Sequence, residues 1–432
     1  MLRYRTMTNI DVYTIYEREK KQYQQYLDMK LNLDLTRGKP SDAQLAMITA
    51  LGLDDSLSEA DYKSIDGTDI RNYGNLFGLP ESRAFFAEIM GVDSKQVMVL
   101  NNSSLTLMYD FFSRAMLFPL PGSQTAWSKQ SDVKVLCPAP GYDRHFAIAE
   151  GFGLSLIPID MTDEGPDMDQ VEAWVKDPTV KAMFCVPLYS NPGGVVYSEA
   201  VCERLAAMTT APDFRIIWDN AYCLHHLDWD KPEAIPNVMD LAAEAGNPNR
   251  FIQFMSTSKI TYAGSGLAAM AASEEDFAYL EKGLKLQTIG PDKVNQRRHL
   301  NFFAKQGGIE SVMRRHAAIL KPKFDLCLDI LDEELGGSGI AEWSQPSGGY
   351  FISLDLANGQ AKRVVQLAGE AGVKLTPAGS TFPYGNDPDD RNIRLSPTYP
   401  DTADLEKAMK VLCTCVKLSA HEMLLAASSE ES

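Results

Sequence analysis

Short apolar runs alternate with helix-like segments through the middle of the chain. Seven runs predict strands, at residues 96–100, 133–137, 154–159, 181–186, 214–218, 250–255 and 266–272. The segments between them, such as LTLMYDFFSRAML and SEAVCERLAAM, carry apolar residues at helical spacing. This alternation predicts an α/β fold whose large domain has a mostly parallel, seven-stranded sheet with helices on both faces.

The rest of the chain predicts further parts around this sheet. A helical pattern covers about residues 293–335, and the strands and helices beyond it predict a smaller α+β domain. We expect residues 1–66 to form an N-terminal segment that has no sheet of its own and packs on the small domain. The large domain then covers residues 67–305, the small domain covers 306–420, and a flexible tail covers 421–432.

Composition narrows the class of protein. The chain has 432 residues, of which 45% are hydrophobic, and this is enough apolar material for two lobes. The net charge of −17 disfavours a surface that binds nucleic acid or an anionic membrane. The seven cysteines form no C-x-x-C pair, which favours reduced thiols. No run has the length of a membrane span and the N-terminus lacks a signal-peptide core, so we expect a cytoplasmic protein.

Polar residues of distinctive types follow four of the predicted strands. They are Ser103 and Ser104 in NNSSLT, Asn191 in YSNPGG, Asp219 and Tyr222 in WDNAY, and Ser256, Ser258 and Lys259 in STSK. Each has an ordinary structural explanation as a helix cap, a turn residue or a solvated lysine. Together they occupy the sheet edge at which α/β proteins bind ligands, and this agreement favours a common site.

The chemistry that uses this set of residues is that of pyridoxal 5′-phosphate. A lysine such as Lys259 forms a Schiff base with the aldehyde of the cofactor, because desolvation or a nearby cation makes its amine nucleophilic. An aspartate such as Asp219 keeps the pyridine nitrogen protonated, so that the ring accepts electrons. Asn191 and Tyr222 are donors for the 3′-oxygen, and hydroxyl groups at a helix N-terminus suit the phosphate.

From about residue 30 to 415 the chain resembles the fold-type I, class I/II pyridoxal-phosphate-dependent aminotransferases. The motifs that carry the resemblance are LTRGKP, RNYGNLFGLPESR, NNSSLTL, PAPGYDRHF, YSNPGG, WDNAY, STSK and NIRLSP. They are most similar to the bacterial aspartate (alanine/aspartate) aminotransferase branch, which is related to the aminotransferase domains of MocR-type regulators. The resemblance implies a homodimer with shared active sites. It also implies ping-pong transfer of an amino group from an L-amino acid, with aspartate preferred, to a 2-oxo acid, with 2-oxoglutarate preferred.

The resemblance further implies roles for single residues. Lys259 is implied as the Schiff-base lysine, Asp219 as the partner of the pyridinium nitrogen, and Tyr222 as a contact of the 3′-oxygen. The other implied contacts are Asn191 at the 3′-oxygen, Tyr142 on the ring face, Ser103, Ser104, Ser256 and Ser258 around the phosphate, Tyr73 at the phosphate of the partner subunit's site, and Gly38, Asn191 and Arg394 at the substrate. For Arg394 the implied task is to clamp the α-carboxylate, which suits a guanidinium fork.

One position departs from the family pattern. Most of these enzymes carry an arginine that binds the phosphate seven or eight residues after the lysine, but here those positions are Gly266 and Leu267. Either another cation, Lys293 or Arg297, takes the place of this arginine, or the helix dipole and the hydroxyl groups are enough to bind the phosphate.

Other charged residues have two interpretations each. Arg37, Lys39 and Arg144 are candidates for binding a substrate's distal carboxylate, and a surface or interface ion pair is the alternative for each. The adjacent His225 and His226 suggest a metal site, but they have no zinc-type cluster of ligands around them, so we expect them to be structural and predict no metal.

The sequence is also compatible with two alternative functions. Fold-type I sites also catalyse elimination and decarboxylation, so a lyase or a decarboxylase is one alternative. The other is a MocR-like regulator that senses a ligand. Those regulators carry an N-terminal DNA-binding domain, and the 30 or so residues before LDLTRGKP are too few to form one.

Overall fold

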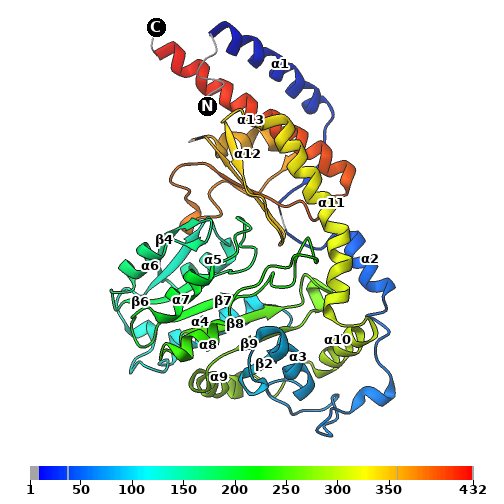
Figure 1. Ribbon diagram of the computed structural model, residues 1–432, viewed down its shortest axis with the longest axis vertical. Coiled ribbons are helices and arrows are strands. Elements are labelled where there is room, and N and C mark those ends of the chain that lie inside the picture. The colour runs from blue at the N-terminus through cyan, green and yellow to red at the C-terminus, as the bar shows by residue number, and fades with distance from the viewer. Residues whose placement is uncertain (1–8, 37, 358, 431–432) are drawn as a thin grey trace.

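A computed structural model describes residues 9–36, 38–357 and 359–430 of the chain. Within these residues, eight strands form the sheet of the large domain, in the lower half of Figure 1. In order across the sheet they are β2 (Val97–Leu100), β9 (Ala268–Ala271), β8 (Phe251–Ser256), β7 (Arg215–Asp219), β6 (Val180–Cys185), β3 (Lys134–Ala139), β4 (Ser155–Thr162) and β5 (Gly165–Pro166).

The central strands of this sheet run parallel, and β9 is antiparallel to both of its neighbours, β2 and β8. The predicted fold class is confirmed, and each of the seven predicted strands overlaps an observed one. The eighth strand, β5, was not predicted, because a two-residue strand is too short to show a hydrophobic pattern.

Helices cover both faces of the large sheet. One face packs on α4 (Ser104–Leu117), α5 (Asp143–Gly151) and α9 (Glu274–Gln287). The other face packs on α6 (Met168–Trp174), α7 (Glu199–Ala207) and α8 (Val238–Glu244). Two further helices, α3 (Pro80–Met90) and α10 (Lys293–Lys305), pack against β2 and β9. Successive side chains of a strand point to opposite faces. In β6, Phe184 therefore packs against Phe112 of α4, whereas Met183 and Cys185 join the cluster of α6, α7 and α8.

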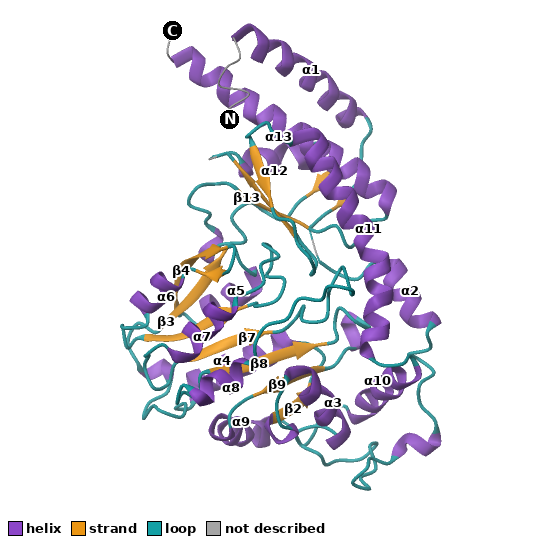
Figure 2. Ribbon diagram, viewed as in Figure 1, coloured by secondary structure: helices purple, strands orange, loops and turns teal. Residues whose placement is uncertain are grey.

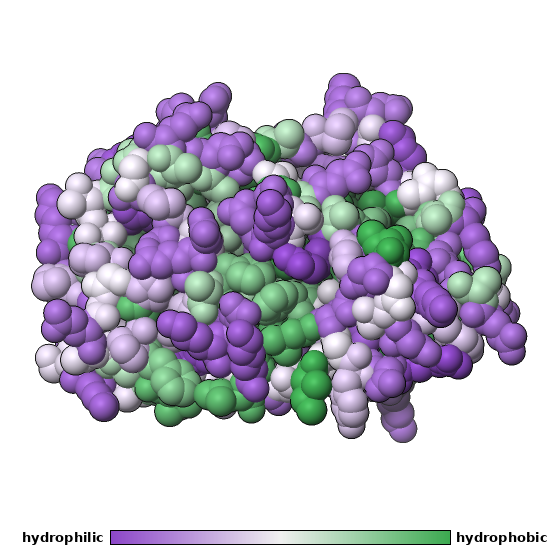
Figure 3. Space-filling model, turned by 90° about the horizontal axis from the view of Figure 1, so that it is seen from below, coloured by the Kyte–Doolittle hydropathy of each residue, from purple (hydrophilic) through white to green (hydrophobic). Residues whose placement is uncertain are grey.

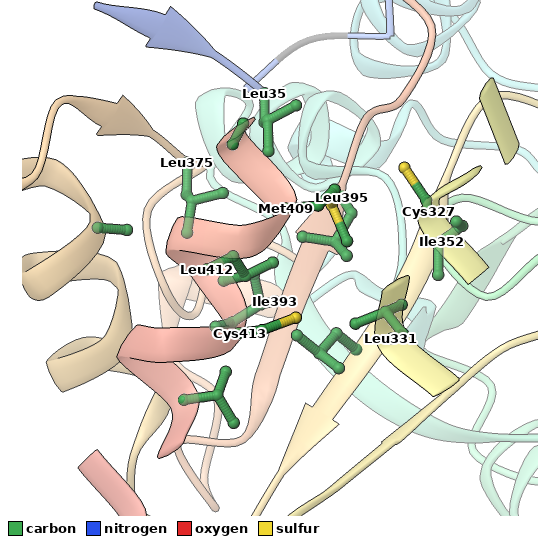
Figure 4. Close-up of a cluster of buried hydrophobic side chains, with 14 of the residues drawn as sticks. Leu35, Cys327, Leu331, Ile352, Leu375, Ile393, Leu395, Met409, Leu412 and Cys413 are labelled. Carbon is green, nitrogen blue, oxygen red and sulfur yellow. The ribbon is translucent and has the colours of Figure 1, made fainter. Parts of the chain in front are cut away.

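The small domain has a three-stranded antiparallel sheet of its own, with its strands drawn in orange in Figure 2. Its elements are α11 (Ile309–Leu335), β10 (Ala341–Trp343), β11 (Ile352–Leu356), α12 (Ala361–Glu370), β12 (Val373–Lys374), β13 (Asn392–Leu395) and α13 (Thr402–Glu430). Figure 4 shows the apolar core between these elements, where Leu331, Ile352, Ile393 and Leu412 are fully buried.

The helical pattern predicted over about residues 293–335 is two helices, α10 and α11. The break falls at Gly307 and Gly308, whose φ angles of 80° and 100° lie outside the right-handed helical region. Only glycine adopts such angles without strain, so this pair ends α10 and redirects the chain into α11.

The N-terminal segment contributes one strand to a two-stranded sheet that it shares with the small domain. Its elements are α1 (Asn9–Asp28), β1 (Leu33–Asp34) and α2 (Asp42–Ala50). β1 pairs in parallel with β12 of the small domain, and α1 lies along α13 (Figure 1). Residues 421–430, expected to be part of a flexible tail, continue α13 as helix. Among the described helices, none combines the length and the apolar character that crossing a bilayer requires.

Candidate active site

A cavity of about 450 Å³ lies where the N-terminal segment and the two domains meet. It is lined by Thr36, Gly38, Lys39, Tyr142, Asp143, Arg144, Tyr222, Lys259, Phe351, Thr376, Pro377 and Arg394. The loops that follow β3, β7 and β8 contribute Tyr142, Tyr222 and Lys259, as expected for the carboxyl ends of parallel strands. The structure thus brings together residues as far apart in the chain as Thr36 and Arg394.

Asp219 is the last residue of β7 and is 4% exposed. Its Oδ2 lies 3.1 Å from Nε2 of His145, whereas its Oδ1 is buried and has no hydrogen-bond partner among the residues that the structure describes. An unpaired buried carboxylate oxygen is costly. The site therefore suits a bound group that offers a positively charged N–H to Oδ1, as a pyridinium ring does.

His145 is a site residue that the sequence analysis missed. It lies in the first turn of α5, where its ring stacks on Phe184 with centroids 4.7 Å apart and meets the Tyr142 ring edge-on at 5.0 Å. Its spacing of three residues from Tyr142 in PAPGYDRHF was an available signal, because such residues share one face of a helix.

Lys259 points toward the ring of Tyr222, with Nζ 4.9 Å from the ring centroid. Tyr222 is 4% exposed. Burial raises the pKa of its hydroxyl, and the Asp219 carboxylate nearby raises it further. Tyr222 therefore keeps its proton at neutral pH and is a hydrogen-bond donor beside the amine.

The turn that carries Lys259 is closed by its own backbone. The N–H groups of Ile260 and Thr261 both donate to the Thr257 carbonyl, at 2.9 Å and 2.8 Å. The hydroxyl of Thr261 lies 2.9 Å from Nε2 of His299, a fully buried residue of α10. Burial lowers the pKa of His299 to about 4, so this imidazole is neutral at pH 7.

Arg394 forms one wall of the cavity from β13. Its Nη1 donates to Oδ1 of Asp143 at 2.9 Å and to Oδ1 of Asn191 at 3.3 Å, and its guanidinium lies 5.0 Å from the centre of the Phe351 ring. Its Nε is buried and has no hydrogen-bond partner within the described part of the chain. Arg394 is thus a fixed cation with donor capacity to spare beside Lys259, which suits a carboxylate ligand.

The serines predicted for the phosphate lie on two adjoining loops. Ser103 is the N-cap of α4, but its side chain makes no capping hydrogen bond, and Ser104 is the first residue of that helix. Ser256 ends β8, and the hydroxyl of Ser258 donates to the Asn102 carbonyl at 2.8 Å. The Lys259 turn therefore lies directly beside the N-terminus of α4, which favours anions.

Gly266 and Leu267 occupy the two positions at which the resemblance implies an arginine, and Leu267 is buried. A Cβ atom at Gly266 would lie 3.1 Å from the Ser258 nitrogen and 3.3 Å from the Asn102 oxygen. The glycine thus allows these two loops to approach each other closely.

Lys293 and Arg297, the two possible replacements for the phosphate-binding arginine, lie outside the cavity. Arg297 donates to Glu81 and, at 3.3 Å, to the Lys63 carbonyl. Lys293 is 4% exposed, and burial lowers its pKa. Neither residue lines the cavity, and neither do the four serines, which lie at the start of α4 and around the end of β8.

The other residues singled out in the sequence do not lie together in one place. Lys39 and Arg144 line the cavity, with the Lys39 ammonium 3.6 Å from the centre of the Tyr399 ring. Tyr73 is 76% exposed, and Arg37 lies outside the described residues. His225 and His226 are both buried, and the described residues contain no cluster of ligands that could hold a metal ion.

Comparisons with known proteins agree with one another. The model of the family described as aspartate amino-transferase matches residues 7–428. An aspartate aminotransferase of Corynebacterium glutamicum is 47% identical over 93% of each chain, and a putative aminotransferase of Mycolicibacterium smegmatis is 47% identical over 96% of this chain and 97% of its own. A crystal structure of an aspartate transaminase from C. glutamicum superimposes with a TM-score of 0.93 at 45% identity, covering 96% of this chain and 98% of its own.

We expect acid to destabilise the protein partly through His299. Its pKa is about 4 when folded and about 6.5 when unfolded, so the unfolded state binds more protons between these values. The free energy of unfolding should therefore decrease as the pH falls from about 6.5 to about 4, with a contribution from His299 on the order of 3 kcal/mol. Denaturant titrations across this pH range should show a smaller decrease in the free energy of unfolding for His299→Gln than for the unsubstituted protein. Parallel losses in the two proteins would contradict this assignment.

Proposed function

The chain belongs to the aspartate aminotransferase family, and on this basis we propose that it transfers the amino group of an L-amino acid, preferably aspartate, to a 2-oxo acid, preferably 2-oxoglutarate. The transfer follows a ping-pong course and depends on pyridoxal 5′-phosphate. The observation that carries the proposal is the unpaired Oδ1 of Asp219, buried beneath the cavity that Lys259 and Arg394 line.

The cofactor, when bound, supplies an aldehyde that captures amino groups and a ring that accepts electrons. Asp219 holds a proton on the ring nitrogen, and His145 keeps the Asp219 carboxylate in place. Lys259 would hold the aldehyde covalently, and its amine would move the proton at the substrate's α-carbon. Asn191 and Tyr222 would donate to the 3′-oxygen, and Tyr142 would cover the ring face.

Substrate binding depends on the cations of the cavity. Arg394 binds the α-carboxylate, which amino acids and 2-oxo acids share, and Asn191 and the backbone of Gly38 lie beside it. Lys39 and Arg144 line the same cavity and are candidates for a second carboxylate. A cavity with cations beyond Arg394 and Lys259 favours dicarboxylic substrates such as aspartate and 2-oxoglutarate over monocarboxylic ones.

The proposed active form is a homodimer in the cytoplasm. Several large apolar side chains are exposed, among them Ile65 at 76%, Tyr73 at 76%, Leu286 at 78% and Ile289 at 65%. Apolar residues also gather near the middle of the face seen in Figure 3. Exposed apolar groups of this size favour a protein partner. A second copy of the chain that covers Tyr73 would bring this tyrosine to the phosphate of the neighbouring site.

Half-reactions test the proposed function directly. Protein loaded with pyridoxal phosphate and given aspartate alone should release one equivalent of oxaloacetate per site and then stop. Added 2-oxoglutarate should restore the starting spectrum and yield an equivalent amount of glutamate. Release of ammonia or carbon dioxide instead would identify a lyase or a decarboxylase, and the absence of any product with a panel of amino acids would indicate a sensor.

Arg394→Ala tests the carboxylate clamp. We expect KM to rise about 10- to 100-fold for both the amino acid and the 2-oxo acid, because the lost hydrogen bonds are made to a charged group. Arg204→Ala is a matched control, since Arg204 pairs with Asp169 and Glu172 on the outer surface of the large domain. Steady-state kinetics measures both variants, and an unchanged KM in Arg394→Ala would place the clamp on another residue.

A further inference from the structure

Two buried side chains from outside the large domain contact the backbone of the Lys259 turn, and a third buried side chain joins these two. Tyr350 donates its hydroxyl hydrogen to the Lys259 carbonyl at 3.2 Å, and Nε2 of His316 lies 2.8 Å from the Ile260 carbonyl oxygen. The side-chain nitrogen of Gln44 joins the two, 2.8 Å from Nδ1 of His316 and 3.1 Å from the Tyr350 oxygen. These three side chains are at most 1% exposed.

The direction of each hydrogen bond follows from its acceptor. A carbonyl oxygen only accepts, so Nε2 of His316 carries the hydrogen and Nδ1 accepts from Gln44. The second amide hydrogen of Gln44 goes to the Tyr350 oxygen, and the Gln44 oxygen accepts the Ser41 N–H at 3.0 Å. Burial lowers the pKa of His316 to about 4 and raises that of Tyr350, so both groups are neutral at pH 7. Each hydrogen of the Gln44 amide therefore has its own acceptor.

We propose that Gln44, His316 and Tyr350 are positioning residues that fix the main chain beneath Lys259. The inference rests on the proposed function, because it assumes that Lys259 carries out the chemistry. A lysine amine is separated from its backbone by a flexible four-carbon chain. It reaches both a cofactor and the α-carbon of a substrate reproducibly only if its Cα is held in place, and a displacement of about 1 Å costs up to about 100-fold in rate.

The same network joins the turn to the carboxylate clamp. Tyr350 precedes Phe351, whose ring lies 5.0 Å from the Arg394 guanidinium. The neighbouring Gly38 has no Cβ, and a Cβ there would lie 2.4 Å from the end of the Phe351 ring. Adjacent residues, Tyr350 and Phe351, therefore contact the Lys259 carbonyl and the Arg394 guanidinium.

Hydrogen exchange tests the proposal without reference to activity. Tyr350→Phe removes one oxygen, and Tyr23→Phe is a matched control, because the buried Tyr23 hydroxyl donates to the Leu367 carbonyl of the small domain at 2.9 Å. In the full-length chain, with and without pyridoxal phosphate, the amides of residues 260 and 261 should exchange about fivefold faster in Tyr350→Phe, as expected for one buried hydrogen bond. The exchange rates of these two amides should be unchanged in Tyr23→Phe. Equal exchange in the two variants would overturn the proposal.

A pair of substitutions at His316 separates positioning from simple loss of structure. His316→Gln keeps an N–H for the Ile260 carbonyl, whereas His316→Leu removes it. We expect kcat to fall about 10- to 100-fold in His316→Leu and to recover in His316→Gln, with unchanged affinity for the unreactive dicarboxylate succinate in both. Equal kcat values in these two variants would overturn the proposal. Absence of transamination by the unsubstituted protein would contradict the proposed function instead, and the exchange experiment would still decide the role of the network.

Discussion

A carboxylate buried at the end of a central strand is the constraint on which the site depends. Asp219 has one oxygen that lies within hydrogen-bond distance of His145 and one that no group of the described residues satisfies. Because a buried charge needs donors around it, the site is complete only with a positively charged donor above Asp219. β7 lies between β6 and β8, so the loops that carry Asn191 and Lys259 flank the same point. Parallel strand order thus places an acid, an amide and an amine around one ring-sized position.

Much of the architecture could be predicted from the sequence because its signals are local. The strands of the large sheet are continuous apolar runs, and the motif residues after them follow strand ends directly. Pairing between β1 and β12 could not be predicted, since each has only two residues and they are more than 330 positions apart. The break between α10 and α11 was readable in principle, because adjacent glycines rarely continue a helix.

The parts of the site that escaped prediction depend on contacts between distant segments. Nothing near Gln44 in the sequence indicates that its amide meets His316 and Tyr350, because those partners come from α11 and from the loop that precedes β11. The pairing of Arg394 with Asp143 likewise appears only when the small domain lies against α5. The departure at Gly266 was visible in the sequence, but its physical reason is the close approach of two loops.

Covalent trapping identifies which lysine binds the cofactor's aldehyde, and we expect this residue to be Lys259. The protein is loaded with pyridoxal phosphate, reduced with borohydride, digested and mapped by mass spectrometry, with Lys259→Ala treated in parallel. We expect a phosphopyridoxyl group on Lys259 in the unsubstituted protein and no labelled peptide in the variant. A label on another lysine, or no label on a protein that shows the cofactor's colour, would contradict this expectation.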